Sequence, residues 1–470
     1  MKRPICLIVL VAVVNAAVYA DSLAQAATLD QRESKIRELI RERVERHHHE
    51  FGLIVGIIST EGRKIIRYGK QSQGGEAVNE DTLFELGSVT KVFTALLLAD
   101  MVKRGEMKYS DPVEKFLPDE VKVPCWNGNK MSLFHLATHT SGLPSTPRTK
   151  TEDRSLPAYL NFTQDDLYNF LSHYELSAQP GTQFEYSNLG FGLLGHIISL
   201  KSGKSFDQLV EERICRPLGL DNTHRELESA LRGRLAVGYF LDGQKAKDIH
   251  MPPVLAGAGG LRSSAGDMLT FLAVNLGLES SALFDAMQET HQGRFPVSKN
   301  ALKVGLSWLV AQGEDLHLVF HGGEKDGYRA FIGFDPENKI GAVVFSNFED
   351  TIDDVGLYAL TGKQEILELV VYKENIKEGQ INPRVYDEYT GKYQTTPSFF
   401  ISVTREGDRL FAQGTGQPKF ELFPESESTF FLKAVRAKVI FERDSSGRVC
   451  RLIVRSAEGK EISQKIEGGL

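Results

Sequence analysis

Three short segments of the 470-residue chain carry side chains that together could break an acyl bond. The first is Ser88-Val89-Thr90-Lys91, at the start of an apolar stretch that predicts a helix over 93–102. Side chains three residues apart on a helix share a face, about one turn apart. A partly desolvated lysine can lose its proton near neutral pH and then take the proton of a neighbouring serine. The pair suits a serine nucleophile with a lysine base, although Ser88 alone could be only a helix N-cap.

The second segment is Tyr186-Ser187-Asn188, between a Pro-Gly turn and an apolar stretch that predicts a helix over 188–202. A tyrosine hydroxyl at a helix entrance could relay a proton between Ser88 and a leaving group. The amide of Asn188 offers a donor and an acceptor to a substrate amide. The alternative is a core tyrosine followed by an asparagine N-cap.

The third segment, His321-Gly322-Gly323-Glu324, ends an apolar stretch that predicts a strand. Two glycines leave the strand edge bare, so an extended substrate backbone can approach it. The N–H of Glu324 could then hold an oxyanion together with the N–H of Ser88. His321 could bind a substrate carboxylate or assist proton transfer. The alternative is a glycine bulge beside a hydrogen-bonded histidine.

The elements that must position these segments predict an α+β domain over 27–380. Strands are expected at both ends of this domain, with helices between them, which indicates one sheet whose first and last strands meet. The expected strands span 52–60, 64–68, 302–310, 316–321, 328–334 and 340–348, and further helices are expected over 29–48, 205–214 and 366–372.

The composition changes near residue 380. Short β-type runs then alternate with turns such as Glu406-Gly407-Asp408 and Ser445-Ser446-Gly447. This spacing predicts a small all-β domain over 381–470, either a sandwich or a barrel.

Residues 1–26 have the layout of a secretory signal peptide. Lys2 and Arg3 precede an apolar run over 5–14, and small residues follow at plausible cleavage positions. The run is too short to span a bilayer comfortably, although an uncleaved anchor is the alternative. We therefore expect a periplasmic or secreted protein with no stable membrane span after cleavage. The cysteines beyond this segment, Cys125, Cys215 and Cys450, are expected to be three buried thiols, with at most one disulfide.

The charge balance argues against a nucleic-acid partner. The chain has 55 Lys+Arg against 62 Asp+Glu, without a basic block. Consecutive histidines at 47–49 point in different directions, and His135 and His139 lack the glutamate of a zinc-protease helix. We expect no metal and no cofactor.

Together, the three segments resemble the serine β-lactamase and D-alanyl-D-alanine carboxypeptidase superfamily, in its class C branch. The segments 84–91, 135–144, 179–181 and 258–263 also look like family segments, and the resemblance covers roughly residues 35 to 350. It implies an antiparallel sheet flanked by helices, with a helical lobe. The C-terminal domain is similar, by pattern alone, to small lipocalin-like domains appended to some of these hydrolases.

The resemblance also implies a role for each candidate residue. Ser88 would be the acylated nucleophile, with Lys91 and Tyr186 as the proton-transfer system. The substrate would be bound by Asn188, by His321 and Gly323, and by an oxyanion hole made of the backbone N–H groups of Ser88 and Glu324. The third motif departs from the Lys-Thr-Gly of typical class C β-lactamases. A histidine in that place is only partly charged at pH 7, so its binding of a substrate carboxylate is less assured. Efficient turnover of β-lactams is therefore in doubt.

The sequence therefore predicts a secreted serine hydrolase that forms an acyl-enzyme at Ser88. Its expected substrates are β-lactams or peptides ending in D-amino acids. Two alternatives remain at this point: a short-chain esterase that uses the same site, and a non-catalytic penicillin- or peptidoglycan-binding protein. The sequence makes no prediction of the oligomeric state.

Overall fold

The structure is a computed structural model in which the described chain forms two compact units, divided after Lys363. The described residues are 28–47, 50–146, 159–297, 302–313, 316–363, 381–396, 399–414, 419–432, 437–444, 446–456 and 459–466. The predicted signal peptide and the predicted helix over 366–372 lie outside these residues. The N-terminal unit below means the described residues up to Lys363.

An antiparallel sheet of eight strands organises the N-terminal unit, in the order β2-β1-β12-β11-β10-β9-β8-β7. The first and last long strands meet as predicted, because β1 pairs with β12 from Leu53–Ser346 to Ile58–Gly341. The strands are β1 (Gly52–Ser59), β2 (Gly62–Gly69), β7 (Phe295–Pro296), β8 (Leu302–Val304), β9 (Leu309–Gln312), β10 (His317–Lys325), β11 (Tyr328–Asp335) and β12 (Ile340–Ser346).

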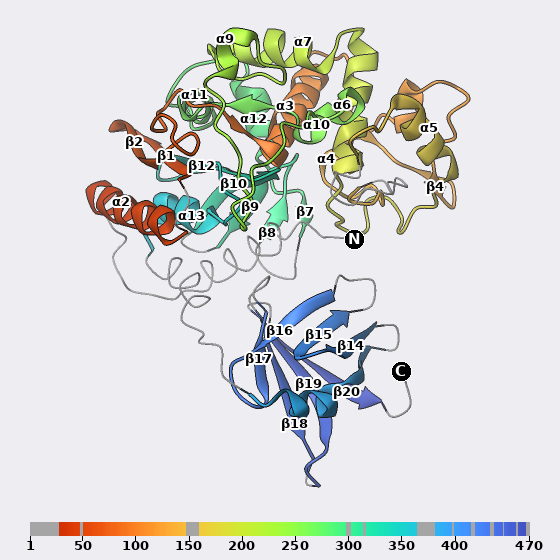
Figure 1. Ribbon diagram of the computed structural model, residues 1–470. Helices are drawn as coiled ribbons and strands as arrows, with labels where there is room; N and C mark the ends of the chain where they lie inside the picture. The colour runs from red at the N-terminus through yellow and green to blue at the C-terminus, as the bar shows by residue number, and fades with distance from the viewer. Residues whose placement is uncertain are drawn as a thin grey trace. The chain divides into compact units, whose positions relative to one another are not determined.

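Helices cover both faces of this sheet (Figure 1). One face carries α2 and α13, which also contact each other, and the other face carries α11 against β1 and β12. The N-terminal helix α2 is amphipathic as expected, with Ile36, Ile40 and Val44 buried. The helices of this unit are α2 (Leu29–Arg46), α3 (Thr90–Lys103), α4 (Leu133–Ala137), α5 (Gln164–His173), α6 (Asn188–Ser202), α7 (Phe206–Val210), α8 (Arg216–Leu218), α9 (Ser229–Arg232), α10 (Ala256–Gly259), α11 (Ala265–Asn275), α12 (Phe284–Thr290) and α13 (Asp353–Thr361).

The prediction of one strand over 302–310 is wrong. The chain turns back at Gly305–Trp308, where Gly305 N–H donates to the Trp308 carbonyl at 2.8 Å and Ser307 has φ 70°. Two short antiparallel strands, β8 and β9, therefore replace the long one. The apolar run hid this turn because both strands are buried, although Gly305 was a possible breaker.

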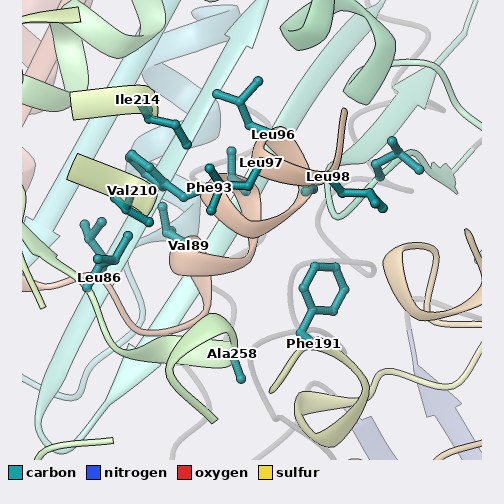
Figure 2. Packing of buried hydrophobic residues seen from close by; sticks show 14 of the residues in the cluster. Leu86, Val89, Phe93, Leu96, Leu97, Leu98, Phe191, Val210, Ile214 and Ala258 are labelled. Atoms are coloured by element: carbon teal, nitrogen blue, oxygen red, sulfur yellow. The ribbon is translucent and has the colours of Figure 1, made fainter. Parts of the chain in front are cut away.

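The helix α3 lies in the middle of the main core and is buried all round. Every side chain from Thr90 to Met101 is buried. Figure 2 shows Phe93, Leu96 and Leu97 of this helix packed among residues of other segments. Burying each such side chain contributes about 1.5–3 kcal/mol. The same packing removes water from the one lysine in this stretch, Lys91.

The C-terminal unit contains a closed barrel of eight strands, β13 to β20 in sequence order. Its core is rich in aromatic residues, with Phe441 stacked on Tyr389 at a centroid distance of 4.3 Å. A short helix, α15 (Tyr386–Tyr389), precedes the first strand. The strands are β13 (Gly391–Thr396), β14 (Phe399–Glu406), β15 (Arg409–Gly414), β16 (Lys419–Pro424), β17 (Thr429–Phe431), β18 (Ala437–Arg443), β19 (Val449–Ser456) and β20 (Gly459–Ile466).

The cysteine prediction is partly wrong. All three cysteines are free, but Cys125 is exposed and Cys450 is half-buried, so only Cys215 is a buried thiol. Cys125 lies on the small hairpin of β4 (Cys125–Trp126) and β5 (Asn129–Lys130), whose strand residues are all exposed. None of the helices among the described residues is long and apolar enough to cross a membrane.

Candidate active site

The nucleophile segment forms a tight turn that leads directly into α3. Ser88 lies in the 3₁₀ turn η1 (Gly87–Val89), and the N-cap of α3 is Val89, whose side chain makes no capping bond. Ser88 is therefore not an N-cap, and its Oγ lies 3.0 Å from Lys91 Nζ. The serine remains partly exposed, so a substrate can reach it.

Lys91 is fully buried and surrounded by neutral oxygens. Besides Ser88 Oγ, its Nζ lies 2.7 Å from Asn188 Oδ1 and 2.6 Å from the Ala258 carbonyl. Burial lowers the pKa of Lys91 well below its usual value, because the charged form loses its hydration. A lysine in this state can be a neutral base at physiological pH.

The second segment meets Lys91 at the start of α6. The ring of Tyr186 lies 5.0 Å from Lys91 Nζ, measured to the ring centroid. The N-cap of α6 is Ser187, whose hydroxyl accepts from Gly190 N–H at 2.8 Å, so the alternative of an Asn188 N-cap is wrong. Tyr186 is only half-buried and is not an ordinary core residue.

Two glycines allow the nucleophile turn to touch strand β10. Gly87 has φ +50°, and a Cβ on it would lie 2.6 Å from the Glu324 carbonyl oxygen. A Cβ on Gly323 would lie 2.1 Å from the carbonyl oxygen of Leu86. Any larger residue would separate the turn from the strand, so Gly323 of the third segment serves this close approach. The predicted alternative of a bulge is wrong, because the β10–β11 register runs unbroken from Val319 to Lys325.

The geometry of β10 frees the backbone of Glu324. The turn at Asp326 and Gly327, with φ 40° and 82°, is of the two-residue type I′ class that joins paired strands. The flanking pair Lys325–Tyr328 then exchanges hydrogen bonds, and bonded pairs alternate along the ladder. Glu324 therefore directs its N–H away from β11. The pairing of β10 with β9 ends at Phe320, so β9 does not accept a hydrogen bond from this N–H.

The ring of His321 is buried, and burial alters its pKa. It is 4% exposed, and its Nδ1 lies 2.7 Å from the Gly322 carbonyl. Burial, together with the nearby charge of Lys91, lowers the pKa of His321 to about 3, although the Gly322 carbonyl opposes this. At such a pKa the ring carries no charge at pH 7, and the binding of a substrate carboxylate by His321 stays a prediction. The sequence could not show this, since burial was contributed by other segments.

His139 supports the tyrosine segment rather than a metal. Its Nδ1 accepts from Ser187 N–H at 3.0 Å, and its ring stacks on Tyr186 at a centroid distance of 4.3 Å. Burial lowers the pKa of His139 well below its usual value, and protonation of Lys91 or His321 would oppose a charge on this ring further. Among the described residues, no group of three or more His, Cys, Asp or Glu side chains could hold a metal ion.

One pocket is lined by three of the seven candidate residues. Ser88, Asn188 and Glu324 line it, and so does Lys325. The Lys325 ammonium lies 2.9 Å from Glu85 Oε2, and Arg262 holds the other oxygen of that carboxylate at 2.7 Å. Sequence reasoning missed Lys325. The signal was present, because a lysine directly before an Asp-Gly turn must end the strand that carries the third segment.

Two stretches of the chain match known protein families. Residues 36–361 match the family described as Beta-lactamase, and residues 376–468 match a domain family of unknown function, DUF3471. The D-alanyl-D-alanine-carboxypeptidase/endopeptidase AmpH of Escherichia coli is 30% identical over 328 residues, which are 65% of this chain and 83% of that protein. A protein named Beta-lactamase from the same organism is 30% identical over 309 residues, 58% of this chain and 77% of its own.

A solved structure extends the likeness in fold to both units. The octameric penicillin-binding protein homologue from Pyrococcus abyssi covers 91% of this chain and 99% of its own, with a TM-score of 0.64 and 23% identity. At this identity the likeness concerns the fold alone.

Proposed function

The chain belongs to the beta-lactamase family, and on that premise we propose that it is a serine hydrolase that works through an acyl-enzyme at Ser88. The observation that carries this proposal is the contact of 3.0 Å between Ser88 Oγ and Lys91 Nζ in a site that desolvates the lysine. A hydroxyl beside a neutral amine is activated for attack on an acyl carbon.

The proposed reaction has two halves. The neutral Lys91 amine takes the proton of Ser88 as Oγ attacks the substrate carbonyl carbon. The developing oxyanion accepts hydrogen bonds from the N–H groups of Ser88 and Glu324. Tyr186 passes the proton to the leaving group, which departs as the acyl–nitrogen bond breaks. Water then attacks the Ser88 ester by the reverse proton path and releases the acid.

We propose β-lactams and peptides ending in D-amino acids as the substrate class. The name of the Escherichia coli relative AmpH supports the peptides, and the beta-lactamase relatives support the lactams. Beside Glu324, strand β10 is no longer paired with β9 and lines the pocket, which suits the extended backbone of either substrate. The layout of residues 1–26 further supports an assignment to the periplasm or the exterior.

A fluorescent penicillin tests this proposal. We expect covalent labelling of the wild-type protein and no labelling of Ser88→Ala, with the adduct located on the peptide that contains residue 88 by mass spectrometry. A matched control is Ser264→Ala, whose serine lies outside the pocket as the N-cap of α11. Labelling that persists in Ser88→Ala would refute the nucleophile.

The neutral state of His321 favours one second candidate, a short-chain esterase. Without a charged histidine, a substrate carboxylate loses the partner expected for it, whereas a neutral ester loses nothing. Hydrolysis of a nitrophenyl ester, with none of nitrocefin or of a D-Ala-D-Ala peptide, would establish this candidate. The reverse pattern would exclude it.

A further inference from the structure

We propose that the Lys325 ammonium is the group in this site that binds the free carboxylate of the substrate. This inference rests on the proposed function and specifies its substrates as acyl compounds that carry a carboxylate beside the scissile bond. Lys325 would be a substrate-binding residue, with no part in the proton transfers at Ser88.

The position of Lys325 on β10 is the first argument. Side chains alternate along a strand, so His321, Gly323 and Lys325 share one face. Gly323 presses against Leu86, just before the nucleophile turn. Lys325 is therefore two residues beyond Gly323, the point at which β10 meets that turn. It lines the same pocket as Ser88.

The charge of Lys325 is the second argument. The two buried lysines of this site have opposite surroundings. The contacts of Lys91 are neutral oxygens, whereas Lys325 lies 2.9 Å from the carboxylate of Glu85. Lys325 is therefore held in an ion pair at the pocket, whereas the ring of His321 contacts the neutral Gly322 carbonyl.

The local balance of charge is the third argument. Glu85 is 4% exposed and is shared by two buried cations, Arg262 and Lys325. Arg262 has a further carboxylate partner in Asp248 at 2.7 Å, whereas Lys325 forms its ion pair with Glu85 and has the adjacent Asp326 carboxyl as a weaker electrostatic neighbour. An ammonium has three donors, and an incoming carboxylate can take those that Glu85 does not use.

No other cation among the described pocket-lining residues competes for this role. Lys325 is the one cationic side chain in that lining. The acidic side chain of Glu324 also lines the pocket, but its Oε2 is bound by Arg329 at 2.6 Å. Arg329 in turn donates from Nε to the Glu349 carbonyl at 2.7 Å, so this pair is anchored away from Lys325.

A matched pair of substrates tests the inference. We would measure the second-order rate constant for acylation of Ser88 by benzylpenicillin and by its methyl ester, using intact-protein mass spectrometry on the full chain. For Lys325→Met we expect the rate with the acid to fall roughly 10- to 100-fold, as for the loss of a charged hydrogen bond. The rate with the methyl ester should stay within about 2-fold, because that substrate has no charge for the lysine to bind.

Two further variants separate substrate binding from a structural role. Lys325→Arg keeps the positive charge and should restore most of the preference for the acid. Lys303→Met removes an exposed lysine from β8 of the same sheet and should change neither rate. Because Arg262 still compensates Glu85, the Lys325→Met protein should fold.

The possible failures are distinguishable. An equal fall of both rates in Lys325→Met, or no fall in either, would overturn the inference and leave the proposed function standing. A wild-type protein that neither compound acylates at Ser88 would overturn the proposed function, and this inference with it.

Discussion

The two units of this protein bury polar groups in opposite ways. The N-terminal unit buries charged or ionisable side chains around its pocket, among them Lys91, Arg262, His139 and His321. In the described part of the C-terminal barrel no charged side chain is buried, and Ser463 is the one buried polar side chain apart from the tyrosines. Its core tyrosines instead donate their hydroxyls to backbone carbonyls, Tyr389 to Glu427 at 2.6 Å and Tyr393 to Tyr389 at 2.7 Å.

This difference separates a reactive interior from a structural one. Desolvated amines and imidazoles cost folding free energy, and a protein retains them where their altered pKa serves a reaction. A tyrosine hydroxyl bonded to a carbonyl is fully satisfied and has no such potential. The proposed chemistry accordingly uses side chains of the N-terminal unit.

The strongest test of the comparison removes the buried base. We expect Lys91→Met to lower acylation of Ser88 by a penicillin about 10³- to 10⁴-fold, because the serine then lacks its proton acceptor. The measurement is the second-order rate of adduct formation. Lys103→Met, an exposed lysine at the end of the same helix, is the control and should acylate normally. A loss below about 10-fold would remove Lys91 from the mechanism.

The second test truncates the barrel core. Phe441 is 2% exposed and stacks on Tyr389, so Phe441→Ala should lower the unfolding free energy of the barrel by about 3 kcal/mol. Acylation of Ser88 should be unchanged at temperatures where the barrel remains folded. Thermal unfolding followed by circular dichroism, together with the acylation rate, measures both effects. The half-buried Phe411 supplies the control, since Phe411→Ala should cost about 1 kcal/mol or less. If acylation fell along with barrel stability, the separation of roles would break down.

A third test moves the nucleophile turn away from β10. Gly323→Ala would place a Cβ 2.1 Å from the Leu86 carbonyl oxygen, so we expect a loss of about 2 kcal/mol in stability and a marked loss of acylation. Gly233→Ala is the matched control, because nothing lies within 4 Å of its Cβ position and its φ of −67° suits alanine. Chemical denaturation and the acylation rate measure the two effects. Normal acylation by Gly323→Ala would show that the close approach is not needed.

The smallest expected effect concerns the pH profile. His321 has a pKa of about 3, so it stays neutral as the pH falls from 8 to 5. Its protonation therefore cannot cause a decrease in the acylation rate over that range. Any loss of acylation over that range should instead reflect protonation of Lys91, whose neutral form is the active one. His321→Gln should leave unchanged the pH at which the acylation rate falls to half. If the decrease in acylation rate at low pH were lost in His321→Gln, the histidine would be shown to titrate near its ordinary value.

Much of the fold could be predicted because it depends on local patterns. The amphipathic stripe of α2, the hairpin of β1 and β2, and the pairing of the first and last strands follow from periodicity and order along the chain. The turn at Gly305–Trp308 could not be predicted from the same pattern, because two buried short strands and one long strand share a continuous apolar run. The closed barrel was one of two alternatives, and closure depends on β13 meeting β20, two strands that are distant in sequence.

The sequence by itself determined which residues could react. Helical spacing places Ser88 and Lys91 on one face whatever surrounds them, and only glycine permits the contact between Gly323 and Leu86. The tertiary structure alone decided the charge that each group carries. Segments distant in sequence bury Lys91 and His321, which lowers the pKa of each, and they bring Glu85 to Lys325. Solvation and Coulomb energy depend on all the surrounding atoms, and spacing along one strand or helix does not fix those surroundings.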